Sequence, residues 1–323
     1  MRALQITEHG GIDQLKMIDL PSRPLASGEV RIKVKAAALN FADLLVLKGT
    51  YQSIPPLPFI PGMEATGKVI EVSDDADGVY VGDDVVAFVN AGGYAEELVT
   101  HCSNIWQAPK GASAPEAAAY PVAYGTSELA LFDRARLQEG ETLMVHGAAG
   151  GVGLAAVQLG KAMGATVIAT AGGSEKCALA KENGADHIID YKNESIKKRV
   201  KELVGNVDVV YDPVGGDAFN QSLRVMNSLG RILLVGFASG DVPRIPANHL
   251  LVKNIDIQGY YWGDYIKYTP KKVTKSFERL NKLYQTNKIK PHVSATFPLE
   301  KTAEALDFLK SRQATGKVII TMD

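Results

Sequence analysis

The stretch HGAAGGVG, residues 146–153, decides the fold of this 323-residue chain. It follows an apolar run that begins at Thr142, and its last residues open the helix-like run VGLAAVQLGKAMG. Glycine at every third position permits a tight turn, lets backbone amides approach a pyrophosphate and allows close helix–strand packing, while the helix N-terminus adds a positive dipole. We interpret the segment as a dinucleotide-binding turn, the alternative being a glycine-rich turn without a ligand. Its candidate contacts are Gly150, Gly151, Val152 and Gly153.

The segments that follow Thr142 alternate between strand-like and helix-like composition. In order they read TLMVHGA, VGLAAVQLGKAMG, ATVIATA, SEKCALAKENG, DHIIDY, DVVYDPVG, AFNQSLRVMNSLG and RILLVGFA. Such alternation predicts right-handed βαβ units, and the apolar strands indicate a parallel sheet buried on both faces. The predicted fold class is therefore α/β with a doubly wound parallel sheet.

The end of the second predicted strand favours a phosphorylated dinucleotide. An NAD site usually carries an acid about 20 residues after the glycine turn, where it bonds the ribose 2'-hydroxyl. Here the strand ends in TAGGSEK, residues 170–176, with no acid directly at its end. Ser174 and Lys176 can hydrogen-bond and neutralise a 2'-phosphate, so we expect NADPH, with Gly172 as a further contact. Glu175 opposes this interpretation, and Lys176 as an ordinary exposed lysine at a helix start stays open.

Composition indicates a globular protein with two cores. The chain is 46% hydrophobic and 22% charged, with a formal net charge of -1, so no strong field attracts nucleic acid or anionic lipid. No apolar run approaches the ~20 residues of a membrane span, and we expect a cytoplasmic protein. Cys102 and Cys177 fit neither a disulfide framework nor a zinc spacing.

Residues 1 to about 120 read as short apolar segments separated by Gly, Pro and Asp, which indicates a mostly β domain. The alanine-rich, helix-like stretch 114–132 marks a domain boundary. The last strand-like segment, GKVIITM, is expected to return to the first domain.

Eight segments together resemble the medium-chain dehydrogenase/reductase superfamily, in its zinc-free, zeta-crystallin-like quinone oxidoreductase branch. They are LNFADLLVLKGTY (39–51), PGMEATGKV (61–69), VGDDVVAF (81–88), HGAAGGVGLAAVQLGKAMGATVIAT (146–170), GADHIIDY (184–191), DVVYDPVGG (208–216), LVGFASG (234–240) and ATGKVII (314–320). The resemblance implies a GroES-like catalytic domain of residues 1–121 and 264–323, and a Rossmann NADP(H)-binding domain of residues 122–263.

Departures from the alcohol dehydrogenase branch of that superfamily predict that no zinc is bound. Asn40 and Met63 stand where the zinc enzymes carry Cys and His, and neither completes a thiolate/imidazole tetrahedron. Glu64 is retained from the zinc pattern and is interpreted as structural. Without a Lewis acid to stabilise an alkoxide, reduction of a conjugated acceptor remains, because it needs mainly a positioned hydride donor.

Asn40, Asp43 and Tyr51 are the catalytic candidates, on a loop similar to that of this branch and of enoyl-thioester reductases. Tyr51 is either an acid that assists protonation or a lid over the nicotinamide. Asn40 is expected to bond the nicotinamide ribose or the acceptor carbonyl, and Asp43 to orient the loop. The resemblance also implies cofactor contacts, each with core packing as its alternative: Thr126, Tyr191, Gly236, Phe237, Tyr261, Trp262 and Lys317.

The resemblance and these residues imply transfer of a hydride from NADPH to a quinone or a similar conjugated carbonyl. An enone, alkenal or enoyl-thioester reductase is the alternative among enzymes. A protein that binds NADPH in a structural or interaction role is the alternative outside them. A homodimer is expected because an apolar strand near 254–261 would otherwise leave an exposed sheet edge.

Overall fold

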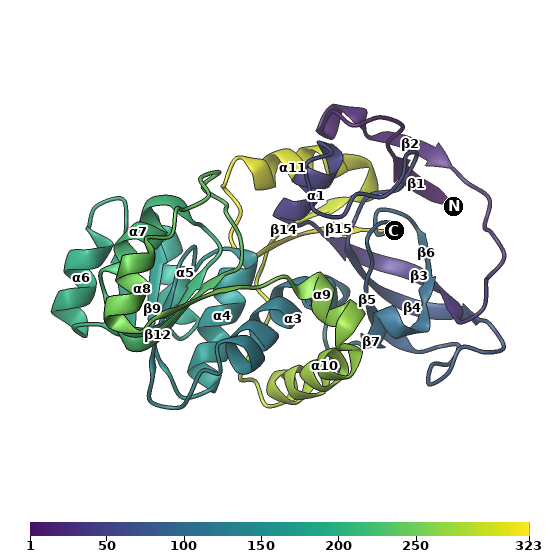
Figure 1. The fold of residues 1–323 in the computed structure, drawn as a ribbon. Coiled ribbons are helices and arrows are strands. Elements are labelled where there is room, and N and C mark those ends of the chain that lie inside the picture. Colours follow the sequence, from purple (N-terminus) through teal and green to yellow (C-terminus); the bar gives the residue numbers. More distant parts are fainter. Residues whose placement is uncertain (323) are drawn as a thin grey trace. The chain divides into compact units, whose positions relative to one another are not determined.

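The computed structural model describes residues 1–322, which fold into two compact units. The first unit is built from Met1–Val122 and Pro291–Asp323, and the second is the intervening segment Ala123–Lys290. The chain thus forms an α/β fold with a mostly β, GroES-like unit and a Rossmann-like unit (Figure 1). The fold class predicted from the sequence is confirmed.

The first unit contains a mixed sheet whose strand order is β14-β15-β3-β4-β5-β7, with β6 also paired to β3, and a separate β1-β2 pair. Its strands are β1 (Arg2–Gln5), β2 (Lys16–Asp19), β3 (Glu29–Ala38), β4 (Glu64–Val72), β5 (Asp84–Phe88), β6 (Glu97–His101), β7 (Ile105–Gln107), β14 (Val293–Pro298) and β15 (Lys317–Thr321). Its α-helices are α1 (Phe41–Leu47), α2 (Ala114–Ala118) and α11 (Thr302–Lys310). Short 3₁₀ turns are η1 (Ile12–Gln14), η2 (Cys102–Asn104) and η4 (Leu299–Lys301).

The late strand β15 lies inside this sheet, parallel to β14 and antiparallel to β3, with Ile319 opposite Ala38. Strand β3 buries Val34 and exposes Lys33 and Lys35, as a half-buried strand should. Its last residues, 36–38, are buried alanines, and the small side chains let α2 pack on one face of the sheet while the main core fills the other. The closing segment therefore joins the first unit, as the sequence suggested.

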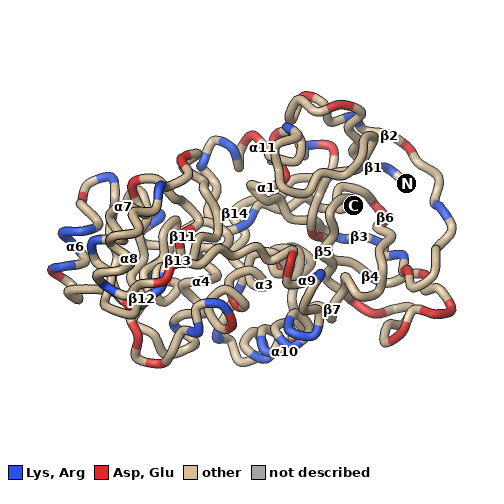
Figure 2. Tube along the Cα trace, viewed as in Figure 1, with Lys and Arg blue, Asp and Glu red and all other residues tan. Residues whose placement is uncertain are grey.

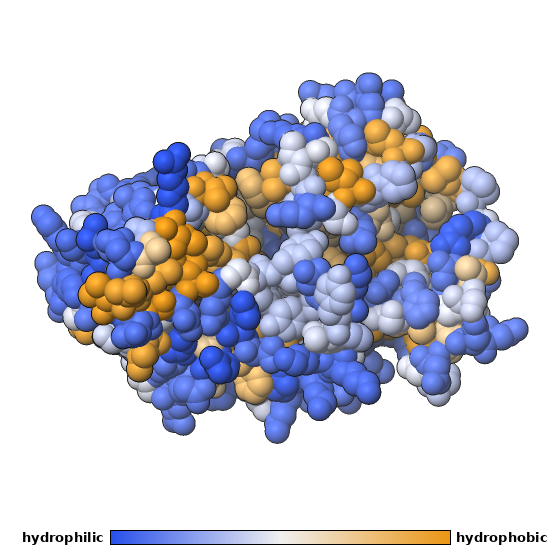
Figure 3. Space-filling view, in the orientation of Figure 1, coloured by the Kyte–Doolittle hydropathy of each residue, from blue (hydrophilic) through white to orange (hydrophobic). Residues whose placement is uncertain are grey.

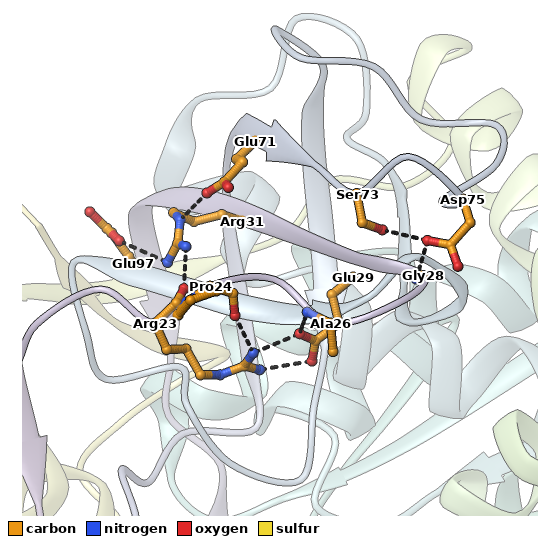
Figure 4. Close-up of polar contacts among 10 residues, drawn as sticks. All are labelled: Arg23, Pro24, Ala26, Gly28, Glu29, Arg31, Glu71, Ser73, Asp75 and Glu97. Carbon is orange, nitrogen blue, oxygen red and sulfur yellow. Dashed lines mark hydrogen bonds and ion pairs between the residues drawn. The ribbon is translucent and has the colours of Figure 1, made fainter.

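Charged side chains fasten the segment before β3 to the sheet (Figure 4). The guanidinium of Arg31, with only 8% of its side chain exposed, donates to Glu71 at 2.7 Å, to Glu97 at 3.3 Å and to the carbonyl oxygen of Arg23 at 2.5 Å. Arg23 in turn holds both carboxylate oxygens of Glu29 at 2.7 Å, and this hydrogen bonding lowers the pKa of Glu29 to about 2. A paired arginine with satisfied donors is tolerated at this degree of burial.

The second unit contains a wholly parallel sheet in the order β10-β9-β8-β11-β12-β13, as the alternating pattern predicted. Its strands are β8 (Thr142–Val145), β9 (Thr166–Ala171), β10 (His187–Asp190), β11 (Val207–Asp212), β12 (Met226–Leu234) and β13 (Asp256–Gly259). Its helices are α3 (Pro121–Leu129), whose first two residues belong to the first unit, the π-helical turn η3 (Ala130–Arg134), α4 (Gly151–Ala162), α5 (Ser174–Glu182), α6 (Ile196–Leu203), α7 (Gly216–Leu223), α8 (Ala247–Lys253), α9 (Trp262–Tyr268) and α10 (Pro270–Gln285).

The order in which strands are added reverses between β8 and β11, because β9 and β10 extend to one side of β8, and β11 to β13 extend to the other. In open α/β sheets the crevice at the carboxyl ends of the strands beside such a point is where ligands bind. The glycine turn 146–153 follows β8 at this place.

Residues 264–290 group with the second unit, whereas the domain boundaries expected from the sequence assigned them to the first. Helix α10 explains the difference. Its Ser276 and Arg279 donate to the buried carboxylate of Glu128 on α3 at 2.5 Å each, and Phe277 packs against Trp262 of α9 with ring centroids 6.3 Å apart. These contacts all lie within the second unit.

Lys and Arg residues are frequent along α10 and α6, and residues of both charges alternate along the rest of the trace (Figure 2). A hydrophobic patch lies in the region that α8 occupies in Figure 1 (Figure 3). Leu251 and Val252 on this helix are 79% and 75% exposed. Of the helices in residues 1–322, none is long and apolar enough to cross a membrane.

Candidate functional site

The glycine turn forms a cradle that requires glycine at two positions, one for its backbone conformation and one for space. Gly147 has a positive φ of 58°, and a Cβ at Gly153 would lie 2.2 Å from the carbonyl oxygen of Gly147. Gly150 caps α4, and the first N–H groups of the helix, including those of Val152 and Gly153, have no carbonyl to bond within the helix. This arrangement fits a pyrophosphate, because donors and the helix dipole converge where no side chain intrudes.

Helix α3 packs against the same turn. The Ser127 hydroxyl donates to the carbonyl oxygen of Val152 at 2.9 Å and lies 2.9 Å from the Tyr211 hydroxyl. Its neighbour Thr126 is a buried polar residue, 8% exposed. A Cβ at Gly125 would lie 2.4 Å from the indole of Trp262, so Trp262, itself 5% exposed, packs in the core of the second unit.

The predicted contacts of the adenosine end lie at the ends of β9 and β10. A Cβ on Gly172 would lie 2.6 Å from the Tyr191 hydroxyl, and Tyr191 is 52% exposed. Ser174 and Lys176 lie in the first turn of α5. The structure adds Asp190, which sequence reasoning missed: its Oδ1 accepts from the N–H of Gly173 at 3.0 Å, and this bond lowers the pKa of Asp190. The sequence feature that could have indicated Asp190 is the acid at the end of the strand-like segment DHIIDY.

The predicted contacts Gly236 and Phe237 follow β12. The N–H of Ala238 donates to the carbonyl oxygen of Pro213 at 3.0 Å, which ties this loop to the loop after β11. Phe237 is 37% exposed, and Tyr261, after β13, is 38% exposed. Both aromatic residues therefore present surface at the carboxyl ends of the strands of the second unit.

His146, at the end of β8, is a buried structural residue. Its Nε2 is 2.7 Å from the Ser222 hydroxyl, which itself donates to the carbonyl oxygen of Ala218, so Nε2 carries the hydrogen. Its Nδ1 is 2.9 Å from the Thr170 hydroxyl. Burial lowers the pKa of His146, although Asp212 nearby acts in the opposite direction, and the neutral ring matches this pair of contacts.

The catalytic candidates Asn40 and Asp43 lie at the start of α1 in the first unit. The Oδ2 of Asp43 accepts from the backbone N–H of Asn40 at 2.7 Å and from the Tyr94 hydroxyl at 2.8 Å. Asp43 is 1% exposed, and burial raises its pKa to about 7 against these two hydrogen bonds. Tyr94 was not singled out in the sequence, and only its place between two glycines and an alanine in AGGYA hinted at a close approach. Tyr51 is half-buried at the edge of the core of the first unit.

A buried ion pair lies behind Asn40. The ammonium of Lys317, on β15, is 2.7 Å from Oε1 of Glu64, on β4, and their side chains are 7% and 0% exposed. Both also bond the Asn40 side chain. The Lys317 ammonium donates to Asn40 Oδ1 at 2.7 Å, and Asn40 Nδ2 donates to Glu64 Oε1 at 2.8 Å. The second carboxylate oxygen of Glu64 accepts from the N–H of Val122 at 2.7 Å. Lys317, expected at the cofactor, thus has its ammonium directed to groups of the first unit.

No group of three or more His, Cys, Asp or Glu side chains that could hold a metal ion occurs within residues 1–322. At the two positions compared with the zinc pattern, Met63 is 6% exposed in the hydrophobic core, and Asn40 bonds to Glu64 and Lys317.

Comparison with known proteins agrees with this architecture. Residues 26–125 match the model of the alcohol dehydrogenase GroES-like domain, and residues 151–280 match the model of the zinc-binding dehydrogenase family. Quinone oxidoreductase-like protein 2 of Rattus norvegicus is 42% identical, over 95% of this chain and 89% of its own length. The synaptic vesicle membrane protein VAT-1 homolog of Homo sapiens is 34% identical, over 99% of this chain and 86% of its own.

Among solved structures, the Escherichia coli quinone oxidoreductase complexed with NADPH superposes with a TM-score of 0.91 at 30% identity, covering 99% of this chain and all of the other. This chain belongs to the medium-chain dehydrogenase/reductase superfamily and is quinone oxidoreductase-like within it. It is accordingly a member of an oxidoreductase family.

Proposed function

We propose that this chain transfers a hydride from NADPH to a quinone or a similar conjugated carbonyl without a catalytic metal. The observation that carries the proposal is the environment of Asn40. Where the zinc enzymes have a thiolate ligand, this chain has a carboxamide that bonds a buried lysine and a buried glutamate. Such a site offers a hydrogen-bond donor to an oxygen that gains negative charge, and it offers no soft ligand for zinc.

The residues of the second unit support NADPH as the cofactor. The turn 147–153 holds a pyrophosphate on backbone N–H groups and the dipole of α4. Ser174 and Lys176 in the first turn of α5 hydrogen-bond and neutralise a 2'-phosphate, beside Gly172 and Tyr191. The E. coli relative, named as a complex with NADPH, supports the same choice.

In the mechanism we propose, the bound cofactor supplies the hydride, and the residues of the chain orient and protonate. Asn40 donates from Nδ2 to the acceptor carbonyl or to the nicotinamide ribose. Asp43 holds the backbone N–H of Asn40 and thereby fixes the start of α1. Tyr51 either donates a proton to the reduced acceptor or covers the reacting groups, and these two roles predict different mutant kinetics.

The test is NADPH oxidation by the purified full chain against a panel of quinones, alkenals and enoyl-CoA esters. Turnover with quinones supports the proposal, and turnover confined to alkenals or enoyl esters would favour the alternative enzyme. If NADPH binds and none of these acceptors is reduced, the hydride-transfer proposal is wrong and a binding role replaces it. Elemental analysis of chelator-washed, active protein tests the metal-free part, and stoichiometric zinc would contradict it.

A further inference from the structure

All hydrogen-bonding capacity of the buried ammonium group of Lys317 is used inside the first unit. An ammonium has three hydrogens and no acceptor. Three oxygen atoms accept these hydrogens: the carbonyl oxygen of Leu39 at 2.9 Å, Oδ1 of Asn40 at 2.7 Å and Oε1 of Glu64 at 2.7 Å. Because an ammonium can only donate, the atom of Asn40 that faces Lys317 has to be the oxygen.

Glu64 fixes the other end of the same carboxamide. As the carboxylate partner of Lys317 it can only accept, so the atom of Asn40 that faces Glu64 at 2.8 Å has to be the nitrogen. The second hydrogen on this nitrogen has only a weak contact, to Ala38 O at 3.5 Å, which is at the limit of a hydrogen bond. The partly exposed Asn40 therefore keeps one N–H that can be given to another oxygen.

The backbone of Asn40 is held independently of its side chain. Its N–H donates to Asp43, whose carboxylate is also held by the Tyr94 hydroxyl. Asn40 thus contacts β4 and β15 directly, and the segment before β6 reaches it through Asp43. A side chain fixed in this way loses little conformational freedom when a ligand binds.

We propose that Lys317 and Glu64 are positioning residues that fix the polarity of the Asn40 carboxamide, so that this side chain presents its free N–H and not its oxygen to a ligand. Under the proposed function, on which this role in turnover rests, the donor meets an oxygen that becomes more negative as the hydride is added, and the hydrogen bond strengthens in the transition state. A freely rotating amide would present its oxygen for part of the time and would repel that charge.

The decisive variant is Lys317→Met with Glu64→Gln, which removes both charges together and leaves neither one buried alone. The N–H of Val122 needs an acceptor, so the oxygen of the new glutamine side chain is expected to turn to it. The glutamine NH₂ then faces Asn40, whose amide has to reverse because two donors cannot bond. With Asn40 donating to the acceptor carbonyl, we expect kcat to fall by about 10-fold or more, with the Kd of NADPH changed by less than about 3-fold. Parental kcat would overturn the proposal.

Arg31→Met is the matched control for the loss of the buried cation in the double variant. Both changes remove a cation of the first unit with nearly equal exposure of the side chain, 8% and 7%, but Arg31 contacts Glu71, Glu97 and Arg23 and not Asn40. Arg31→Met and the double variant should both lower stability, and only the double variant should lower kcat, because with Lys317→Met alone the carboxylate of Glu64 still orients the Asn40 amide. Equal losses of kcat would mean that the effect is general destabilisation.

A spectroscopic measurement decides the positioning role without turnover. In protein labelled with ¹⁵N-asparagine, the Asn40 side-chain amide is assigned from the signal that Asn40→Ser removes. In the parent its two protons should be widely separated, because one bonds a carboxylate, and in the double variant the separation should collapse. An unchanged pair of signals would overturn the proposal even if the parent is active, whereas a parent without any acceptor turnover would sink the proposed function and leave this result standing.

Discussion

The Tyr94 hydroxyl donates to the carboxylate of Asp43 at 2.8 Å, and both side chains are buried, so the loop that carries Asn40 is anchored to a residue 51 positions further along the chain. Burial raises the pKa of Asp43 to about 7 and that of Tyr94 well above its ordinary value. A carboxyl group at the start of α1 therefore changes its charge near neutral pH.

Asp43→Asn should change how stability depends on pH. Because the folded-state pKa of Asp43 is raised from 3.8 to about 7, the folded chain binds the proton more tightly than the unfolded chain. The contribution of Asp43 is thus fully present below about pH 4 and is lost as the pH rises to about 7, at up to ~1.4 kcal/mol per pH unit. Urea unfolding of parent and variant across this range should show this slope in the parent only. Parallel curves would contradict the burial argument.

Gly153→Ala should damage both the fold and cofactor binding. The new methyl group would lie 2.2 Å from the carbonyl oxygen of Gly147, and one of the two backbone segments has to move. Overpacking of this kind costs roughly 1–3 kcal/mol. In Gly150→Ala the same atom would be 3.4 Å away, an ordinary contact, so its urea midpoint should stay near that of the parent. Equal midpoints for the two variants would disprove the close approach.

Lys176→Ala should reduce the preference for NADPH over NADH. Loss of a charge-assisted bond to the 2'-phosphate is expected to cost about 1–3 kcal/mol in NADPH binding and little in NADH binding. Lys181→Ala is the control, because Lys181 lies in the last turn of the same helix and bonds the carbonyl oxygen of Asp186. Titration of both cofactors by fluorescence measures the preference, and equal affinities in the parent would remove the basis of the NADP assignment.

Tyr51→Phe separates the two interpretations of Tyr51. If the reaction reduces an enone or an enoyl thioester, loss of a positioned acid should lower turnover ~100-fold or more. Reduced quinone oxygens are less basic and can take protons from water, so quinone turnover should change little. Steady-state kinetics with one acceptor of each kind makes the comparison, and a nearly unchanged rate with both would leave Tyr51 as a lid only.

The chain should form a homodimer through the sheet edge of the second unit. Strand β13 is the edge strand, and Leu251 and Val252 on α8 just before it are 79% and 75% exposed. Pairing of this edge with a second copy would satisfy its backbone groups and cover those side chains. Light scattering at micromolar concentration should give the mass of a dimer, and Leu251→Lys with Val252→Glu should weaken it. A monomeric parent would refute the prediction.

Local patterns carried the prediction of the second unit. The glycine spacing of 147–153 and the apolar strands specify a turn and a parallel sheet from residues close together in the sequence. The environment of Asn40 could not be read in the same way, because Lys317 lies 277 positions from it and reaches it only through the register of β15 beside β3. Residues 264–290 have an amphipathic helical pattern that fits either unit, and the partner Glu128 on α3 decides.

The insertion of β15 between β14 and β3 also sets an order of events during synthesis. Residues 123–290 are made in full before the first unit receives its last strand, so the second unit can fold while the first is still open along β3. Until Lys317 arrives, the carboxylate of Glu64 has no counter-charge, and burying it alone would be costly. The first unit therefore closes around Asn40 only after β15 has been translated, and a nascent chain cut short before β15 cannot assemble this part of the site.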